Sequence, residues 1–183
     1  MKPWKRIEPT IVSKIGWRTV VTKLFKMPDG KLQHWQTLSP EGSQASATIA
    51  LTGDNRVIVA CQFRPGPEKI FNELPGGGVD ADDEHLEAAA RRELLEETGY
   101  EAGSMTFLGH ITYDAYSNGI HNYFLARDCT LHPDGQKLDE NEFIEVHLIS
   151  IDELFENARN GNMTDVAAVF LAYEQLKKIS KGE

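Results

Sequence analysis

The sequence predicts an α/β fold with one main domain. Segments of apolar and β-branched residues, typical of β-strands, occupy residues 46–52, 56–63, 105–113 and 121–128. A helix-forming segment lies between the second and third of these, and two amphipathic segments close the chain. A chain of 183 residues is long enough for one domain with a sizeable core and a small appendage.

Residues 1–40 are predicted to form that appendage, a strand-rich arm. Residues 17–27 and 31–39 are expected to make a hairpin around the turn residues Pro28, Asp29 and Gly30. Three tryptophans fall in the arm, which is more aromatic surface than a small hairpin leaves in water: Trp4, Trp17 and Trp35. We expect the arm to pack on its own domain or, as the favoured alternative, on a second subunit.

Residues 82–98 are predicted to form a helix that ends at Gly99. The last three acids of this segment follow i, i+3, i+4 spacing, so they lie on one side of the helix: Glu93, Glu96 and Glu97. Two of them, Glu93 and Glu97, continue an apolar stripe that is expected to face the core.

Three carboxylates in this position are unfavourable unless something positive neutralises them. They repel one another, lie near the negative end of the helix dipole and lose solvation. The alternative is a solvated acidic helix end. A divalent cation would remove the penalty, and oxygen ligands without nearby Cys or His favour Mg²⁺, with Mn²⁺ possible, over zinc.

The segment before this helix contains three consecutive glycines. A short strand is predicted at residues 71–74, and Pro75 with Gly76–Gly78 is expected to form the loop that leads into the helix. Glycine lets the backbone approach a metal or an anion without obstruction by a side chain. A strand, a glycine loop and a helix N-terminus in sequence often bind anions.

These residues together resemble the signature of the Nudix hydrolases. The match covers nine specified positions: Gly78, Glu84, Arg92, Glu93, Leu94, Glu96, Glu97, Gly99 and Tyr100. The resemblance implies that the helix holds metal ions against a diphosphate, with the carbonyl of Gly77 as a further ligand. It also implies an orienting ion pair between Glu84 and Arg92, for which the alternative is a solvated pair without a role.

An acidic loop near residue 140 is expected to complete the chemistry. Hydrolysis of a phosphoanhydride needs a positioned water and a base that takes its proton. The string DENEFIEVH resembles the catalytic loop of bacterial ADP-ribose pyrophosphatases. That resemblance assigns the base to Glu140, with Glu142 as the second choice, and the alternative is a solvated acidic turn.

Similarity to the ADP-sugar branch of the family extends over most of the chain, including QFRPG, NELPGGGVD and the closing helices. It implies an α/β/α sandwich around a mixed sheet and a homodimer formed by the N-terminal strands. It also implies hydrolysis of a nucleoside diphosphate sugar. ADP-ribose, giving AMP and ribose 5-phosphate, is the leading substrate, and GDP-mannose or another sugar nucleotide comes next.

Five residues are candidates for substrate contact. Arg64 ends a strand and is expected to contact a phosphate or base, or else to be a surface charge. Gly78 is the last residue of the glycine segment, and Val79 follows it. Trp17 could stack a base, and the alternative is that it packs in the core or in a dimer interface. Tyr116 stands where ADP-ribose pyrophosphatases commonly have proline and resembles the dinucleoside-polyphosphate branch.

Two other functions are left open by the sequence. One is hydrolysis of nucleoside triphosphates or dinucleoside polyphosphates, favoured by Tyr116 and opposed by the long arm. The other is a Nudix-fold nucleotide-binding regulator without turnover, which is opposed by the presence of all the signature acids.

The net charge and the hydropathy of the chain limit the kinds of binding partner that are expected. The net charge of −9 opposes binding to a nucleic-acid backbone or an anionic membrane, because both need a basic surface. The start of the chain has no apolar leader segment and no stretch approaches 18 apolar residues, so a soluble, cytoplasmic protein is expected.

Cys61 and Cys129 lack metal-type spacing and are predicted to be reduced thiols. The last helix is predicted at 165–178, with Val166, Val169, Phe170, Tyr173 and Leu176 buried.

Overall fold

The computed structural model describes all residues except 81, 82, 84 and 183, and the chain divides into two units. The first unit comprises residues 1–44 and 111–121, and the second comprises 45–110 and 122–183. The first unit therefore runs beyond the predicted arm at its C-terminal side and includes a segment from the middle of the chain.

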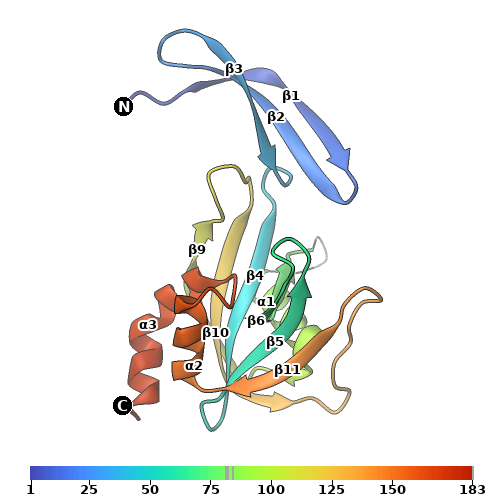
Figure 1. The fold of residues 1–183 in the computed structure, drawn as a ribbon, viewed down its shortest axis with the longest axis vertical. Coiled ribbons are helices and arrows are strands. Elements are labelled where there is room, and N and C mark those ends of the chain that lie inside the picture. Colours follow the sequence, from blue (N-terminus) through green and yellow to red (C-terminus); the bar gives the residue numbers. More distant parts are fainter. Residues whose placement is uncertain (81–82, 84, 183) are drawn as a thin grey trace. The chain divides into compact units, whose positions relative to one another are not determined.

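The first unit is built on a three-stranded antiparallel sheet in the order β1-β2-β3 (Figure 1). Its strands are β1 (Lys5–Ile15), β2 (Arg18–Lys26) and β3 (Leu32–Leu38). The predicted hairpin is confirmed by the pairing of Val20 with Leu38 through Lys26 with Leu32. Strand β1 was not predicted separately. Gly16, at φ 60°, supplies the left-handed turn that reverses the chain between β1 and β2.

Residues 111–121 join this sheet through backbone hydrogen bonds at the end of β3. Leu38 donates its N–H to the Tyr116 carbonyl at 2.7 Å, and Asn118 donates to the Leu38 carbonyl at 2.9 Å. The ring of Tyr116 stacks on Trp35, with 6.5 Å between centroids. Trp35 also lies 5.7 Å from Trp4, so these two tryptophans of the arm form part of an aromatic cluster.

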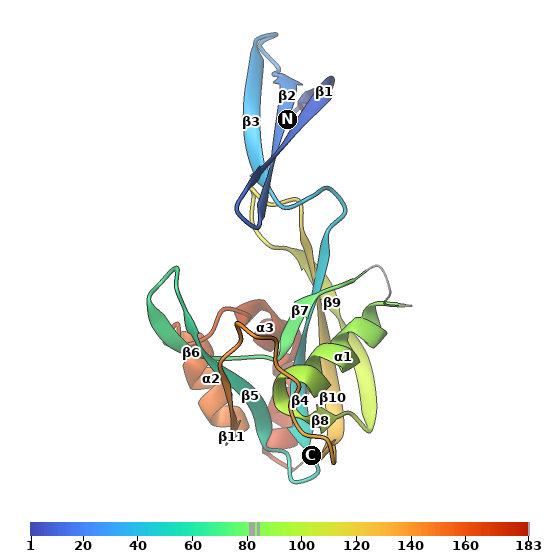
Figure 2. The same ribbon diagram turned by 90° about the vertical axis from the view of Figure 1, so that its right-hand side faces the viewer.

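The second unit contains the main sheet and three helices, the α/β architecture that the sequence predicts (Figure 2). The order along the sheet is β11-β5-β4-β10-β8, with β6 on β5, β7 on β4 and β9 on β10. The strands before the helix are β4 (Gln44–Thr52), β5 (Val57–Arg64), β6 (Lys69–Glu73) and β7 (Gly76–Gly78). Those after it are β8 (Tyr100–Glu101), β9 (Ser104–Thr112), β10 (Ile120–Leu131) and β11 (Ile144–Ile149).

The sheet is mixed and covered on both faces. Strands β4 and β10 run in the same direction, whereas β5 is antiparallel to β4 (Figure 1). Helix α1 (Leu86–Thr98) covers one face, and α2 (Ile151–Arg159) and α3 (Val166–Ser180) cover the other (Figure 2). Residues Val57–Ala60 of β5 have no exposed surface, as predicted for a central strand.

The core lies between the helices and the sheet. On the α1 side, Leu94 packs with Ala50, Ile58, Ala126 and Cys129. Both cysteines are free thiols, as predicted. None of the helices in the described part of the chain is long and apolar enough to cross a membrane.

Helix α1 begins at Leu86, so the prediction of a start near residue 82 was wrong. His85 is the N-cap, and its Nδ1 accepts the N–H of Ala88 at 3.0 Å. Asp83, two residues before the cap, accepts the N–H of Asp80 at 2.8 Å. The end at Gly99, which has φ 73°, is confirmed.

The glycine segment is a strand rather than the predicted loop. Ser46 pairs with Gly77 and Ala47 with Gly76. A Cβ on Gly76 would lie 2.2 Å from the Ser46 carbonyl oxygen. Glycine is therefore required here by the close approach of β4 rather than by a left-handed backbone.

The buried face of α3 also differs from the prediction. Val169 and Leu176 are buried as expected, but Phe170 is 81% exposed and Val166 is 42% exposed. The core contact is made by Ala168, Ala172 and Leu176, which are spaced four residues apart on one face.

Candidate active site

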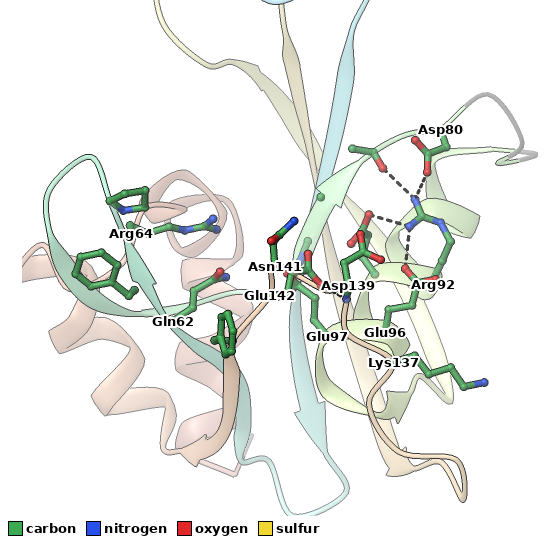
Figure 3. Close-up of a pocket in the computed structure, with 17 residues that line it drawn as sticks. Gln62, Arg64, Asp80, Arg92, Glu96, Glu97, Lys137, Asp139, Asn141 and Glu142 are labelled. Atoms are coloured by element: carbon green, nitrogen blue, oxygen red, sulfur yellow. Dashed lines mark hydrogen bonds and ion pairs between the residues drawn. The ribbon is translucent and has the colours of Figure 1, made fainter. Parts of the chain in front are cut away.

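A pocket of about 670 Å³ lies in the second unit, between the end of β5, strand β7, helix α1 and residues 137–143 (Figure 3). This volume is in the range of small-molecule sites, roughly 300–1,000 Å³. Its acidic lining residues are Asp80, Glu93, Glu96, Glu97, Asp139 and Glu142. Its basic ones are Arg64, Arg92 and Lys137. A pocket this acidic suits an anionic ligand only if cations accompany it.

Helix α1 places its three carboxylates at increasing depth. The side chain of Glu96 is 40% exposed and that of Glu93 is 14% exposed. Glu97 is buried, with 6% of its surface exposed. The i, i+3, i+4 spacing thus brings the three residues to one side of the helix at the pocket, as the sequence predicts.

Strand β7 packs directly against these carboxylates. The Gly76 N–H donates to Glu97 Oε2 at 2.8 Å. A Cβ on Gly77 would lie 2.5 Å from Glu93 Oε1, so any larger residue here would displace the Glu93 carboxylate. The glycine segment therefore meets the C-terminal half of the helix, rather than forming the anion site at the helix N-terminus that the sequence suggested.

The two deeper carboxylates have raised pKa values. Burial raises the pKa of Glu97 to about 8, against the Gly76 hydrogen bond, and Glu93 and Glu142 add repulsion. Burial also raises the pKa of Glu93, against the favourable effect of Arg92. A negative charge on either residue is therefore unfavourable here without a nearby cation.

Arg92 is the basic residue that contacts two of the three helix carboxylates, Glu93 and Glu96. Its Nη1 donates to Glu93 Oε1 at 2.9 Å and to Glu96 Oε2 at 3.0 Å. On its other side, Nε and Nη2 bind the carboxylate of Asp83 at 3.2 and 3.0 Å. Nη2 also donates to the Gly78 carbonyl at 3.0 Å. Arg92 therefore joins Asp83, strand β7 and two of the three carboxylates, and Figure 3 shows it beside Asp80 and Glu96.

The donor atoms at this site fit a hard divalent cation. Glu93, Glu96 and Glu97 offer carboxylate oxygens, which Mg²⁺ and Mn²⁺ prefer. Among the residues that the structure describes, no three acidic, His or Cys side chains converge as a ready-made metal site. Glu93 and Glu96 are instead paired with Arg92, so metal ligation requires these two side chains to turn toward Glu97.

The acidic loop brings Glu142 to the pocket. Glu142 lines it and is close enough to Glu93 and Glu97 to raise the pKa of both. Glu142 Oε2 accepts the N–H of Asp139 at 3.0 Å, and Glu142 N–H donates to the Asp139 carbonyl at 3.0 Å. Glu140 is exposed and does not line the pocket.

The same loop is attached to the end of α1. The Lys137 N–H donates to the Glu96 carbonyl at 2.9 Å, and the His132 N–H donates to the Gly99 carbonyl at 2.8 Å. Gln136 Nε2 donates to the Glu97 carbonyl at 2.6 Å. These bonds satisfy carbonyl groups that a helix end leaves free, and they fix the loop beside the carboxylates.

The predicted substrate residues fall into two groups. Arg64 and Gly78 line the pocket, and Val79 follows Gly78 without lining it. Trp17 is 84% exposed and Tyr116 is 59% exposed. Both belong to the first unit, and their contact with substrate stays a prediction. Glu84, the predicted partner of Arg92, lies outside the described residues.

Asp83, Phe63 and Phe143 are among the site residues that were not singled out from the sequence. Asp83 is bound to Arg92, and its position one residue before Glu84 was the available signal. Phe63 and Phe143 line the pocket with exposed rings. Phe143 stands in an otherwise acidic loop, where an aromatic residue without a core pattern could have indicated ligand contact.

The second unit thus combines helices on both faces of a mixed sheet with a pocket where helix α1 presents three carboxylates beside the glycine strand β7. Comparison with known families matches residues 42–171 to the NUDIX domain. The chain therefore belongs to the Nudix family and is a Nudix hydrolase, as the sequence predicts.

Individual relatives agree with this assignment. The chain is 30% identical to the ADP-ribose pyrophosphatase of Bacillus subtilis (strain 168) over 155 residues, which covers 84% of this chain and 82% of the relative. It is 28% identical over 158 residues to a methanol dehydrogenase activator of Bacillus methanolicus, covering 85% and 84% of the two chains. The crystal structure of an ADP compounds hydrolase superposes with a TM-score of 0.79 at 23% identity, covering 97% and 96%. This last likeness confirms the fold.

Proposed function

We propose that the protein hydrolyses the diphosphate linkage of a nucleoside diphosphate sugar in a Mg²⁺-dependent reaction. The leading substrate is ADP-ribose, which gives AMP and ribose 5-phosphate. The observation that carries the proposal is the meeting of Glu93, Glu96 and Glu97 with Glu142 around one pocket. The similarity to an ADP-ribose pyrophosphatase supports the choice of substrate.

Each reaction requirement has a residue in the pocket. A divalent cation held by Glu93, Glu96, Glu97 and the Gly77 carbonyl would neutralise charge on the diphosphate oxygens. Glu142, the second choice from the sequence, orients the attacking water and takes its proton, because it lines the pocket, and Glu140, the first choice, is the alternative base. Arg64, at the opposite side of the pocket, binds a phosphate oxygen. Water adds across one P–O bond of the anhydride, and the other phosphate leaves.

Arg92 has a supporting role in this mechanism. Its Nη1 binds both Glu93 and Glu96, and the positive charge between the two carboxylates reduces their mutual repulsion. Its bond to Asp83 fixes the guanidinium from the opposite side. The proposal treats Arg92 as a residue that orients the carboxylates rather than one that reacts.

A substrate panel tests the proposal. Purified protein is incubated with ADP-ribose, GDP-mannose, diadenosine polyphosphates and nucleoside triphosphates, with and without Mg²⁺, and products are separated by chromatography. We expect AMP from ADP-ribose, and no turnover after chelation. Turnover that persists in a chelator contradicts the metal-dependent mechanism, and preference for polyphosphates would favour the alternative that Tyr116 suggested.

We also propose that the arm, residues 1–40, forms a homodimer and contacts substrate. The apolar side chains of Ile11, Val12, Ile15 and Trp17 are each more than half exposed on β1 and its turn. Exposed apolar residues grouped on one edge are typical of an interface. Light scattering at micromolar concentration should give twice the chain mass of 20.5 kDa, and a monomer mass would exclude the dimer.

A further inference from the structure

A buried carboxylate lies next to the pocket without being part of its lining. Glu73, at the end of β6, is 1% exposed. Phe71, two residues earlier on β6, and Leu74, which follows the strand, are also buried. A carboxylate in such surroundings is kept only when partners satisfy its oxygens, because burying an unpaired charge is highly unfavourable.

Arg64 is the charged partner of Glu73. Arg64 Nε and Nη2 both lie 2.5 Å from Glu73 Oε2. The β5–β6 register sets Glu73 opposite Ala60 and Arg64 opposite Lys69, so the two residues meet because their long side chains reach toward each other along the hairpin. The Arg64 side chain is 44% exposed, so one end of the pair is buried and the other faces the pocket.

This pairing leaves one donor nitrogen for a ligand. Within the described chain, Nε and Nη2 are engaged by Glu73, and Nη1 has no hydrogen-bond partner. Figure 3 shows the Arg64 guanidinium directed from the β5 side of the pocket toward the side that carries the carboxylates. A guanidinium fixed in this way has already lost the rotamer freedom that an unrestrained arginine would lose on binding.

A third residue holds the carboxylate from behind. Thr164 donates its hydroxyl to Glu73 Oε1 at 2.6 Å. The α2–α3 loop that carries Thr164 is attached to β6, since Asn72 donates its N–H to the Asn162 carbonyl at 3.0 Å. Lys69 Nζ also donates to Asn162 Oδ1 at 2.7 Å. The loop between the last two helices thus supports the rim of the pocket.

We propose that Glu73 and Thr164 are positioning residues that hold the Arg64 guanidinium ready to bind a phosphate oxygen of the substrate. The inference rests on the proposed function, because it takes the ligand to be a nucleoside diphosphate compound. Glu73 acts through Arg64 and does not itself touch the ligand.

The test measures binding of ADP, in the presence of Mg²⁺, by calorimetry. The variants are Arg64→Ala, Glu73→Gln, the double variant and Thr164→Val. Glu73→Gln keeps the size of the side chain but loses the charge, so we expect about tenfold weaker ADP binding, the effect of losing a charge-assisted contact. Thr164 is exposed, so Thr164→Val should fold normally and weaken binding by about two- to threefold.

The double variant separates positioning from a general structural effect. If Glu73 acts through Arg64, the double variant should bind ADP no more weakly than Arg64→Ala alone. Where ADP-ribose is turned over, Glu73→Gln should raise KM and leave kcat nearly unchanged. Glu68→Gln, an exposed change on the same β5–β6 hairpin, is the matched control and should behave as wild type.

Three results would overturn the inference. The first is wild-type ADP affinity in both Glu73→Gln and Thr164→Val. The second is a double variant whose loss of affinity equals the product of the two single losses, and the third is a wild-type protein that does not bind ADP. Absence of ADP-ribose turnover, with the ADP losses as expected, would refute the proposed substrate and leave the role of Glu73 in place.

Discussion

Helix α1 and the loop 132–143 both bring acids to the pocket, but they hold them in different ways. The helix carboxylates are fixed by local periodicity, by the His85 and Gly99 caps, and by burial against β7. The loop has few buried side chains and is held by hydrogen bonds to the last carbonyls of α1. The helix therefore sets the site, and the loop depends on the helix for its position.

The largest expected effect is on the helix side. Glu97→Gln removes the most buried of the three carboxylates, and we expect kcat to fall by on the order of 10³-fold, as when a central charge-stabilising group is lost. The measurement is steady-state turnover of the best substrate of the panel. Glu87→Gln, in the exposed first turn of the same helix, is the control and should retain full activity. Wild-type turnover in Glu97→Gln would show that this carboxylate of α1 takes no part in the reaction.

A second substitution compares two acids of the loop. Glu142→Gln should lower kcat by about 10²-fold, in the range for loss of a general base, because Glu142 lines the pocket. Glu140→Gln should have little effect, since that side chain is exposed and outside the lining. If kcat falls more in Glu140→Gln than in Glu142→Gln, the general base is Glu140, the first choice from the sequence.

The support of the helix side can be tested at Asp83. Asp83→Asn weakens the bond that fixes Arg92, and we expect activity to fall by about tenfold, the smaller end of effects for residues behind metal ligands. Asp80→Asn is the control, because its contact with Arg92 is 3.4 Å long and its side chain is 72% exposed. Equal activities of the two variants would contradict the role of Asp83.

The ion pair between Arg92 and Asp83 predicts that the stability of the fold depends on pH. The hydrogen bond from Arg92 holds the pKa of Asp83 below its usual value. A lowered folded-state pKa stabilises the fold above the unfolded pKa, roughly 3.9, and the contribution disappears as pH falls through the lower value. Denaturant unfolding should show Asp83→Asn less stable than wild type at pH 7 and equally stable near pH 2. A difference that is independent of pH would exclude this ion pair as its cause.

The smallest effect is expected at the loop attachment. Gln136→Ala removes the bond to the Glu97 carbonyl, and kcat should fall by about fivefold, the value of one hydrogen bond. Thermal unfolding should change little, because Gln136 is exposed. Gln33→Ala, in β3 of the first unit, is the control for loss of an exposed glutamine. A large drop in the unfolding midpoint would show that Gln136 supports the fold rather than the loop.

Local patterns were sufficient for much of the fold. The alternation and composition of β4, β5, β9 and β10 predicted these strands within a few residues, and the amphipathic pattern of α2 and α3 did the same for the closing helices. The errors arose where neighbours in space decide the outcome. Helix α1 begins only at Leu86 because His85 caps it there, and the glycine segment is strand β7 because β4 lies close enough to pair with it. Phe170 faces solvent because the alanines of α3 make the core contact.

The sequence by itself determined the family, the sheet-and-helix order and the common side of Glu93, Glu96 and Glu97. These properties follow from spacing along the chain, which a helix or strand converts directly into geometry. Only the tertiary structure decided that Glu142 rather than Glu140 lines the pocket and that Asp83 binds Arg92. It also decided that Glu73 is buried against Arg64. These contacts join residues brought together by strand pairing, helix packing and loop attachment, which local spacing does not encode.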